Sequence, residues 1–323
     1  MKIAIVGAGW VGCHLASVLR HTHDVTLFAP TGEVFDGTSM HNQNRLHLGY
    51  HYARSHRTRE LCKDTFQEFL HAYGHLTQPI HNNLYAVPVN ESLMDFATYL
   101  KIFDDMHHQV VNEPTLKNVE GCIQVDERYI DPAASKNYFQ QQLKSLIVDA
   151  SMSSKDLQHA ADTHDAVVNC TNNFLQPDTN NTFWEQCVML VYSKKQPCNF
   201  GALTLVDGPL FSIYPYLNDT ITLSHVLHTP VHKSSTPSAT FSVDVDQQRR
   251  LMEQDVLRYF PSFHDCFEHQ GHFTSTKIKR NIKCDDRSPV MRVDNNIISC
   301  YTGKIQGIFH IQKFVEHEIS NRE

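Results

Sequence analysis

Five side chains capable of chemistry fall within eight residues of the sequence: Arg45, His47, Tyr50, His51 and Tyr52. A guanidinium binds carboxylate or phosphate, and imidazole and phenol groups donate and accept protons. In an extended segment alternate side chains share a face, so Arg45 and His47 would lie on the same face as Gly49. A glycine there would let a ligand approach the backbone. Arg45 and His47 are therefore the first candidates for catalysis, while any one of the five could instead pack against the segment or cap it.

The N-terminal segment MKIAIVGAGWVG predicts a dinucleotide-binding site. Residues 2–6 indicate a buried strand, which runs into a glycine pattern and then a helix over residues 13–21. In this pattern Gly7 would make a tight turn, Gly9 would let the backbone approach a pyrophosphate, and Gly12 would let the helix pack closely on the strand. The pyrophosphate would bind the free N–H groups at the helix start. A second strand over residues 25–28 completes a βαβ unit, which favours a dinucleotide site over a glycine turn in some other α/β fold.

Composition excludes several classes of protein. The chain has 323 residues, enough for two α/β domains, and its net charge of −7 argues against nucleic acid or an anionic membrane as the main partner. No apolar run approaches the roughly 18 residues of a membrane span. The nine cysteines show no CxxC spacing, which favours reduced thiols. The first strand begins at residue 2, so we expect no targeting peptide and a cytoplasmic location; the sequence does not predict an oligomeric state.

Apolar patterns along the chain alternate between helical and strand periods, which predicts an α/β fold. Helices are expected over residues 57–72, 93–106, 131–143, 243–259 and 308–319. Further strands are expected over residues 83–89, 122–125, 146–149, 165–170, 188–193, 202–206, 210–216, 220–225 and 297–300. Because the first and last segments both fit a nucleotide-binding sheet, the middle segments would be inserted into one nucleotide domain.

Four segments resemble the FAD-dependent oxidoreductases of the D-amino-acid oxidase type, which are glutathione-reductase-like flavoproteins. These segments are the glycine motif with the strand VTLF behind it, the stretch from Ser39 to Gly49, the run DPAASKNYFQQQL followed by LIVDA and DAVVNCT, and TGKIQGIFHIQKFV at residues 302–315. The strands GPLFSIYPY and ITLSHV are similar to the substrate domain of that family. The loop NQNRLHLGYHY is similar to one in a branch of these flavoproteins and, more loosely, in UDP-galactopyranose mutases.

The resemblance implies an α/β fold in which a Rossmann-type FAD-binding domain carries an inserted mixed-sheet α+β substrate domain. The FAD-binding domain would comprise residues 1–80, 130–185 and 275–323, and the substrate domain residues 81–129 and 186–274. FAD is the implied cofactor, and a small molecule is the implied substrate. The residues implied in cofactor binding are Gly7, Ala8, Gly9, Trp10, Val11, Gly12, Ser39, Asn44, Arg45, Leu46, Val148, Cys170, Thr171, Gly303, Lys304 and Ile305.

Two positions depart from the family pattern. The second strand normally ends in an acid that binds the adenosine ribose, and here Ala29 stands in that place. Glu33 or Asp36 would substitute, or backbone and water would hold the ribose. The strand-end turn that usually contains glycine reads Cys170-Thr171-Asn172, so Asn172 would have to adopt a glycine-like backbone conformation.

The resemblance implies oxidation of a C–N bond in a small amine or amino acid, with hydride transfer to flavin N5. Four residues are the catalytic candidates on this basis: Arg45, His47, Tyr214 and Arg287. Arg287 would clamp a carboxylate or phosphate because a guanidinium offers bidentate geometry; the alternative is an ion pair with Asp285 or Asp286. Tyr214 could instead belong to a sheet core.

Two other functions stay open at this stage. A redox-neutral flavin enzyme acting on a nucleotide sugar would fit the mutase-like loop, and a non-catalytic flavoprotein would fit the missing acid at Ala29. No metal site is expected, because Gly49 between His47 and His51 makes it unlikely that these two side chains share a helix face. Covalent attachment of the flavin through this loop is not expected either.

Overall fold

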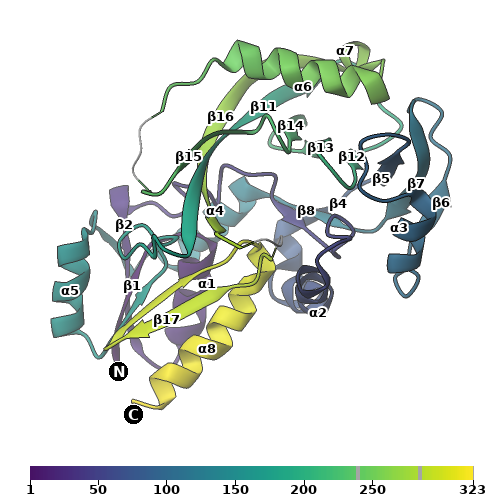
Figure 1. Ribbon diagram of the computed structural model, residues 1–323. Coiled ribbons are helices and arrows are strands. Elements are labelled where there is room, and N and C mark those ends of the chain that lie inside the picture. The colour runs from purple at the N-terminus through teal and green to yellow at the C-terminus, as the bar shows by residue number, and fades with distance from the viewer. Residues whose placement is uncertain (238–240, 283–285, 323) are drawn as a thin grey trace.

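The computed structural model describes residues 1–237, 241–282 and 286–322, and contains two large β-sheets and one small sheet (Figure 1). The first large sheet, with both chain termini near it, forms the lower part of the molecule in Figure 1. The second forms the upper part, under helix α6. The small sheet contains the segment that begins at Arg45.

The first sheet has the topology of a dinucleotide-binding fold. Its strand order is β17-β18-β10-β1-β2-β9, and all pairs are parallel except β17 with β18. The strand order reverses at β1, because β2 and β9 lie on one side of it and the later strands β10 and β18 on the other. Ligands of such sheets bind at the carboxyl ends of the strands beside this point. The strands are β1 (Lys2–Val6), β2 (Asp24–Ala29), β9 (Ile147–Asp149), β10 (Ala166–Asn169), β17 (Val290–Asp294) and β18 (Ile297–Tyr301).

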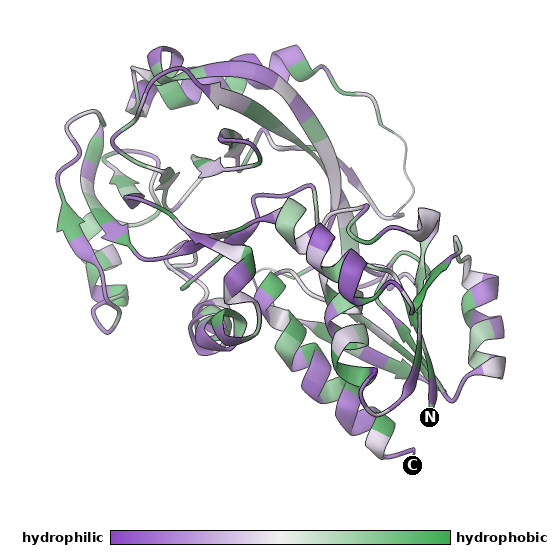
Figure 2. Ribbon diagram, turned by 180° about the vertical axis from the view of Figure 1, so that it is seen from behind, coloured by the Kyte–Doolittle hydropathy of each residue, from purple (hydrophilic) through white to green (hydrophobic). Residues whose placement is uncertain are grey.

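Helices cover both faces of this sheet because successive strand residues point to opposite sides. Ile3 and Ile5 pack in the core with α1 (Trp10–Leu19), α4 (Pro132–Gln142) and α8 (Ile308–Ser320), whereas Ala4 and Val6 pack against α5 (Ser154–Thr163). Hydrophobic and hydrophilic residues alternate along the helix that ends at the C-terminus (Figure 2). Capping fixes the helix starts: the Asp131 carboxylate accepts from the N–H groups of Ala133 and Ala134, and Ser153 forms a capping box with Asp156.

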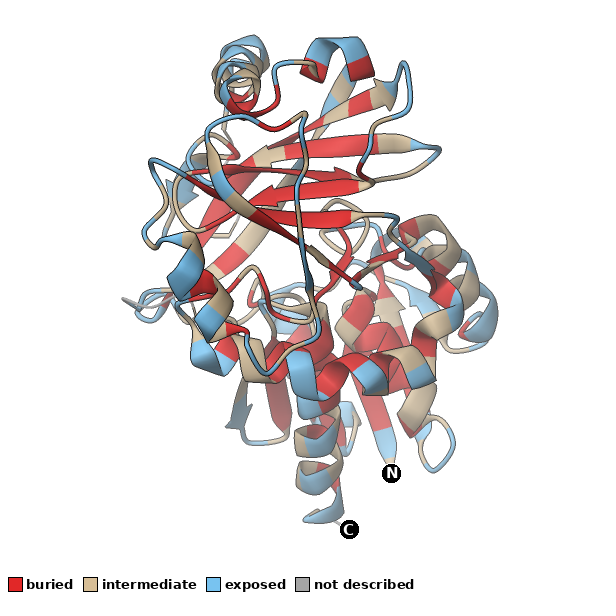
Figure 3. Cartoon of the chain, turned by 90° about the vertical axis from the view of Figure 1, so that its right-hand side faces the viewer, coloured by how far each residue is buried: buried red, intermediate tan, exposed pale blue. Residues whose placement is uncertain are grey.

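The second sheet is mixed and mainly antiparallel. Its order is β15-β11-β14-β13-β12-β5-β7-β6, with β16 also paired to β11, and only β12 and β5 are parallel. Helix α6 (Val245–Tyr259) packs on it through Met252 and Val256, and the strands at its centre are mostly buried (Figure 3). Its strands are β5 (Asn83–Pro88), β6 (Gln109–Val111), β7 (Val119–Val125), β11 (Thr182–Lys194), β12 (Ala202–Leu205), β13 (Phe211–Pro215), β14 (Thr220–His225), β15 (Pro230–Ser234) and β16 (Phe267–Arg280).

The remaining elements connect these sheets. The small sheet has the order β3-β8-β4, and α2 follows the segment that begins with β3. The elements are β3 (Arg45–Leu46), β4 (Thr77–Pro79), β8 (Arg128–Ile130), α2 (His56–Tyr73), α3 (Phe96–Ile102), α7 (Phe263–Cys266) and the 3-10 turns η1 (Pro30–Gly32), η2 (Gly74–Leu76) and η3 (Ile305–Gly307).

The predicted α/β fold with mixed sheets is confirmed, and most predicted elements are present with ends shifted by a few residues. The helix expected over 93–106 is shorter, because it begins only after its N-cap, Asp95, and ends at Ile102. Helix α5 and strands β16 and β17 were not predicted, and neither were the short strands β3, β4, β6, β8 and β15. Strands β11 and β16 extend past the expected domain boundaries, to Thr182 and Arg280, and the division into two domains stays a prediction.

Within the described part of the chain, no helix combines the length and apolar character that crossing a membrane requires. The eight described cysteines are all free thiols, as predicted for them.

Candidate active site

A single large cavity of about 1240 Å³ begins at the carboxyl ends of β1, β2, β10 and β18 and reaches the second sheet. It exceeds the roughly 300–1,000 Å³ of ordinary small-molecule sites, so it has room for a long ligand and a second, smaller one. Its wall at the first sheet includes Gly7 and Gly9, and its wall at the second sheet includes Gln186 and Ser212. The segment from Gly37 to Arg45 lines the path between them.

The glycine motif has the geometry that its spacing predicts. Gly7 has φ of 104°, and a Cβ atom there would lie 2.9 Å from the carbonyl oxygen of Cys170. A Cβ atom on Gly12 would lie 1.9 Å from the carbonyl oxygen of Gly7, so only glycine permits this close packing of α1 on β1. The backbone N–H of Trp10 donates to the hydroxyl of Ser39 at 3.0 Å, which brings the Ser39 segment to the start of α1.

The two departures from the family pattern lie in the cavity wall. Ala29 is fully buried, and the chain turns there through Pro30, so no acid follows β2 directly. Both proposed substitutes, Glu33 and Asp36, line the cavity; Glu33 forms an ion pair with Lys136 of α4. Each therefore has a position from which it could bind a ribose.

The turn after β10 adopts the conformation expected of a glycine position. Asn172 has φ of 55° and Asn173 has φ of 64°, both in the left-handed region that asparagine tolerates better than most residues. The Thr171 hydroxyl donates to the Asn169 side chain at 2.7 Å and accepts from the N–H of Leu175 at 3.3 Å. These side-chain contacts stabilise the turn without a glycine.

The C-terminal turn closes another wall of the cavity. A Cβ atom on Gly303 would lie 3.1 to 3.3 Å from atoms of Arg287, so the turn and the Arg287 segment are in close contact. The ammonium group of Lys304 lies 4.6 Å from the ring centroid of Tyr52. Ile305 and Ile308 also line the cavity, and Ile308 is the first residue of α8, whose N-terminus favours negative charge.

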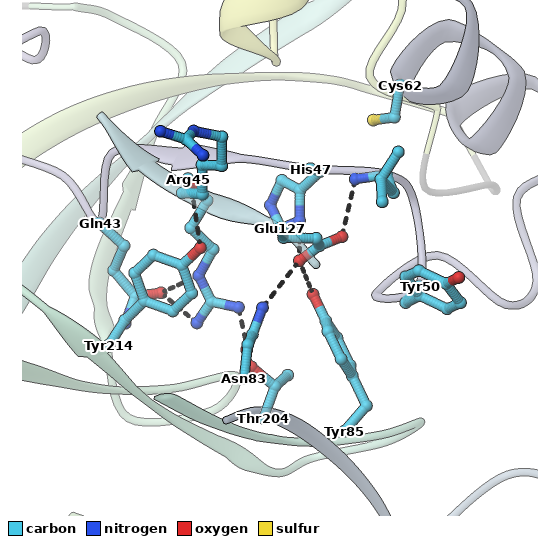
Figure 4. A network of polar contacts seen from close by, with 12 residues as sticks. Gln43, Arg45, His47, Tyr50, Cys62, Asn83, Tyr85, Glu127, Thr204 and Tyr214 are labelled. Carbon is cyan, nitrogen blue, oxygen red and sulfur yellow. Dashed lines mark hydrogen bonds and ion pairs between the residues drawn. The ribbon is translucent and has the colours of Figure 1, made fainter. Parts of the chain in front are cut away.

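Arg45 is held rigidly at the cavity wall (Figure 4). Its guanidinium lies 4.1 Å from the ring centroid of Tyr214 and donates to Gln43 Oε1 at 2.8 and 3.1 Å and to Thr204 Oγ1 at 2.8 Å. Stacking and three hydrogen bonds fix a planar cation whose remaining N–H groups are available to an anion. Tyr214 therefore positions Arg45 from the protein core. Among the described residues, Arg45 lines the cavity and Tyr214 does not.

His47 and His51 also line the cavity, 6.0 Å apart between ring centroids. Burial, together with the positive charges of Lys304 and Arg45, lowers the pKa of His47 well below its ordinary value. Burial and Arg45 likewise lower the pKa of His51. Both imidazoles are therefore neutral at physiological pH.

Arg287 lies in the same wall as Lys277 and Lys279. Burial and the neighbouring charge of Lys277 lower the pKa of Lys279, and both lysines share the carboxylate of Glu185 at 3.2 and 3.3 Å. Asp286, one of the two acids that were alternative partners of Arg287, pairs with Arg280 at 2.9 Å. Both the clamp and the ion pair stay predictions for Arg287. Asp285 lies outside the described residues.

Most predicted cofactor residues line the cavity, with three exceptions among the residues described. Gly12 and Leu46 are buried beside it, and Val148 is 42% exposed on β9. Ala150 and Met152 line the cavity where Val148 was expected, because the chain turns inward only after the end of β9. That the lining residues contact FAD stays a prediction.

Several site residues were not predicted from the sequence. Glu127 and Thr204 have no motif around them, and the fold brings them to the Arg45 segment from distant positions. Gln306 lies in the C-terminal segment TGKIQGIF that carries the resemblance, next to the predicted Ile305, but it was not itself a candidate. Gln43 belongs to the NQN run that was noted, so its place two residues before Arg45 was the available signal.

A histidine–aspartate cluster lies at the far edge of the cavity. His225 Nε2 and His228 Nε2 lie 3.2 and 3.5 Å from Asp255 Oδ2. The N–H of Leu227 donates to His225 Nδ1 at 3.1 Å, so in the neutral ring Nε2 carries the proton and faces Asp255. One ligand atom from each of the three side chains lies within 4.8 Å of the others, a spacing that could hold a metal ion, so the expected absence of a metal site stays a prediction.

The fold and the cavity together define a flavoprotein oxidoreductase. The family model described as FAD dependent oxidoreductase (DAO) matches residues 2–312, and the chain belongs to that family. The FAD-dependent monooxygenase FPY4 of Fusarium mangiferae is 31% identical in an alignment of 336 residues that covers 95% of this chain and 88% of that protein. The FAD-dependent monooxygenase kojA of Aspergillus flavus is 25% identical in an alignment of 362 residues that covers 95% of this chain and 83% of that protein.

Solved structures share the fold at low sequence identity. Glycine oxidase from Geobacillus kaustophilus aligns with a TM-score of 0.72 and 11% identity, over 100% of this chain and 95% of that one. The L-alpha-glycerophosphate oxidase from Mycoplasma pneumoniae aligns with a TM-score of 0.68 and 12% identity, over 97% and 92% of the two chains. The predicted fold family and cofactor are thus confirmed.

The cavity fits FAD on its own geometry. The glycines at 7 and 9 leave room for a pyrophosphate at the start of α1, and the N-terminus of α8 and Lys304 offer positive potential at the other end. Most of the residues that the resemblance assigned to the cofactor line the cavity. When bound, FAD supplies a two-electron acceptor for the substrate.

Proposed function

We propose that this oxidoreductase oxidises a C–N bond of a small amine or amino acid, with hydride transfer to flavin N5. The observation that carries the proposal is the segment from Arg45 to His51, which presents a fixed guanidinium and two neutral imidazoles to one cavity. The guanidinium would bind a carboxylate, and a neutral imidazole would take the proton of an ammonium or amine group. Arg287 and Lys277 add positive charge for an acidic substrate.

The chain's own groups would perform three tasks in this reaction. Arg45 would orient the substrate, because its stacking on Tyr214 and its bonds to Gln43 and Thr204 leave it little freedom. His47 or His51 would hold the proton that the substrate loses. The buried aromatic side chains around the segment, including Tyr50, would keep water out.

The test is an anaerobic titration of the purified yellow protein with a panel of amines and amino acids, followed by flavin absorbance. Bleaching by an amine supports the proposal. Protein that is bleached by dithionite but by no amine in the panel overturns it.

Oxygenation is a second candidate, because the two curated relatives are both named FAD-dependent monooxygenases. It predicts reduction of the flavin by a nicotinamide cofactor and incorporation of oxygen from labelled dioxygen into a product. Family membership makes the chain an oxidoreductase, so the redox-neutral and non-catalytic alternatives are not carried forward.

A further inference from the structure

Glu127 is a buried carboxyl group that the proposed function has not used. It lies in the link between β7 and β8 and is 1% exposed. Its Oε1 accepts from the N–H of Leu48 at 2.7 Å, and its Oε2 accepts from the hydroxyl of Tyr85 at 2.7 Å and from Asn83 Nδ2 at 3.4 Å (Figure 4). Burial is the largest effect and raises the pKa of Glu127, while the bonds from Tyr85 and Leu48 and the charge of Arg45 act in the opposite direction. Groups that donate to both oxygens favour the ionised carboxylate.

The nearest ring to this carboxylate is His47. Its Nδ1 lies 3.7 Å from Glu127 Oε2, which is too long for a hydrogen bond. Nδ1 is buried and has no hydrogen-bond partner among the described residues, so a small rotation toward the carboxylate would satisfy it. Contacts of this kind are often long before a ligand binds and shorten in the complex. Because an ionised carboxylate only accepts, Nδ1 must carry the proton that faces it.

The backbone on both sides of the His47 side chain is fixed as well. Gln306 of η3 donates to the carbonyl oxygen of His47 at 2.7 Å and to that of Cys62 at 2.8 Å. The next N–H, that of Leu48, is the one bound by Glu127. The imidazole is therefore attached to a backbone held from two directions, which limits how far the ring can move away from Glu127.

We propose that Glu127 is a positioning residue that holds His47 with its proton on Nδ1 and leaves Nε2 unprotonated toward the cavity. Nε2 then accepts the N–H proton of the substrate, or an O–H proton in an alcohol. The substrate loses this proton and a C–H hydrogen with its electron pair, which go to His47 and to the flavin respectively, and a C=N or C=O bond forms. The catalytic part of this inference rests on the proposed function. The assignment of the His47 tautomer rests on the contacts described above. A carboxylate that fixes an imidazole tautomer in this way is a general device of enzyme active sites.

Glu127→Gln would reverse the direction of the hydrogen bond between residue 127 and His47 Nδ1. The N–H of Leu48 requires an oxygen at the position of Oε1, so the new amide must place its NH₂ group at the position of Oε2. That NH₂ group would donate to His47 Nδ1 and favour the tautomer with the proton on Nε2. Tyr85→Phe is the matched control, because it removes one donor to the same oxygen and leaves the carboxylate beside His47.

The tautomer is measured directly on the FAD-bound protein labelled with ¹⁵N in its histidine rings. The His47 signals are assigned from their loss in His47→Gln. We expect a protonated Nδ1 and an unprotonated Nε2 in the wild type and in Tyr85→Phe, and a shift toward protonated Nε2 in Glu127→Gln. A wild-type His47 with its proton on Nε2 overturns the proposal, even if Glu127→Gln does not fold.

The rate constant for flavin reduction by a saturating amine is the second readout. We expect Glu127→Gln to lower it by about 10²-fold or more with little change in the substrate dissociation constant, since a general base contributes about 10² to 10⁴. Reduction by dithionite should not change. An unchanged rate constant overturns the catalytic part. If no amine reduces the wild type, the proposed function fails, and the tautomer measurement still decides the role of Glu127.

Discussion

The buried histidine of the dinucleotide-binding helix should make the protein sensitive to acid. His14 of α1 is 3% exposed; its Nε2 donates to Gln312 Oε1 at 2.9 Å, and its Nδ1 accepts from the Tyr73 hydroxyl at 2.7 Å. Burial lowers the pKa of His14 from 6.5 to about 4. In the unfolded chain this imidazole takes up a proton near its ordinary pKa, whereas in the native state it does so only near pH 4.

The sign and size of the effect follow from linkage. As pH falls from 6.5 toward 4, the unfolded state binds a proton that the native state does not, so the free energy of unfolding decreases. At about 1.4 kcal/mol per pKa unit, the full loss attributable to His14 is about 3 kcal/mol, and about 2 kcal/mol of it is lost by about pH 5. Above the ordinary pKa the contribution is constant.

His14→Gln isolates the contribution of His14, because glutamine does not titrate and the variant keeps every other histidine of the wild type. Urea unfolding of both proteins at a series of pH values, followed by tryptophan fluorescence, gives two stability curves. The wild type should lose about 2 kcal/mol more than His14→Gln between about pH 8 and about pH 5. Two parallel curves, with equal urea dependence, would refute the assignment of a buried neutral imidazole to this position.

Four further substitutions test the glycine motif, the N-cap of α4 and the substrate part of the site. Gly9→Ala places a Cβ atom 2.8 Å from the Ser39 hydroxyl and should weaken FAD binding, measured by flavin fluorescence, with little loss of stability. Gly12→Ala places a Cβ atom 1.9 Å from a backbone carbonyl oxygen and should lower the free energy of unfolding by about 3 kcal/mol or more. Asp131→Ala removes the N-cap of α4 and should cost about 1 kcal/mol in the same urea assay. Arg45→Lys loses the planar fork and should raise the amino-acid concentration for half-maximal flavin reduction at least about tenfold; an unchanged concentration would count against a carboxylate-binding role.

The sequence was most informative where local chemistry decides the structure. The glycine motif predicts β1, α1 and their turn because backbone contacts at Gly7 and Gly12 exclude every larger residue. Asp131 followed by Pro132 predicts the start of α4 for the same kind of local reason. The sheet and its ligand-binding edge then follow from the rules of parallel α/β folds.

Prediction from the sequence failed where contacts between distant segments determine the structure. Strand β16 is mostly polar, so its sequence shows little of the apolar pattern that predicts a strand. Its long pairing with β11 determines its conformation. Glu127 follows a strand in an ordinary polar run, and only the approach of β5 and the Arg45 segment makes it a buried acceptor. Alternation predicted that Arg45 and His47 share a face, and both line the cavity, but no spacing indicated that Arg45 would stack on the ring of Tyr214.

The order of the strands in the first sheet bears on how the chain acquires its cofactor site during synthesis. Strand β18 pairs with β10 across about 130 residues of intervening sequence, and Gln306, which holds the backbone of His47, follows it. A ribosome releasing the chain from its N-terminus therefore presents β1, α1 and β2 long before their sheet and its ligand pocket are complete. Contacts of such long range slow folding, and a partly synthesised chain exposes an unpaired edge of β10. The flavin site is consequently a late product of folding, and even a short C-terminal truncation should abolish it as a whole rather than weaken it in proportion.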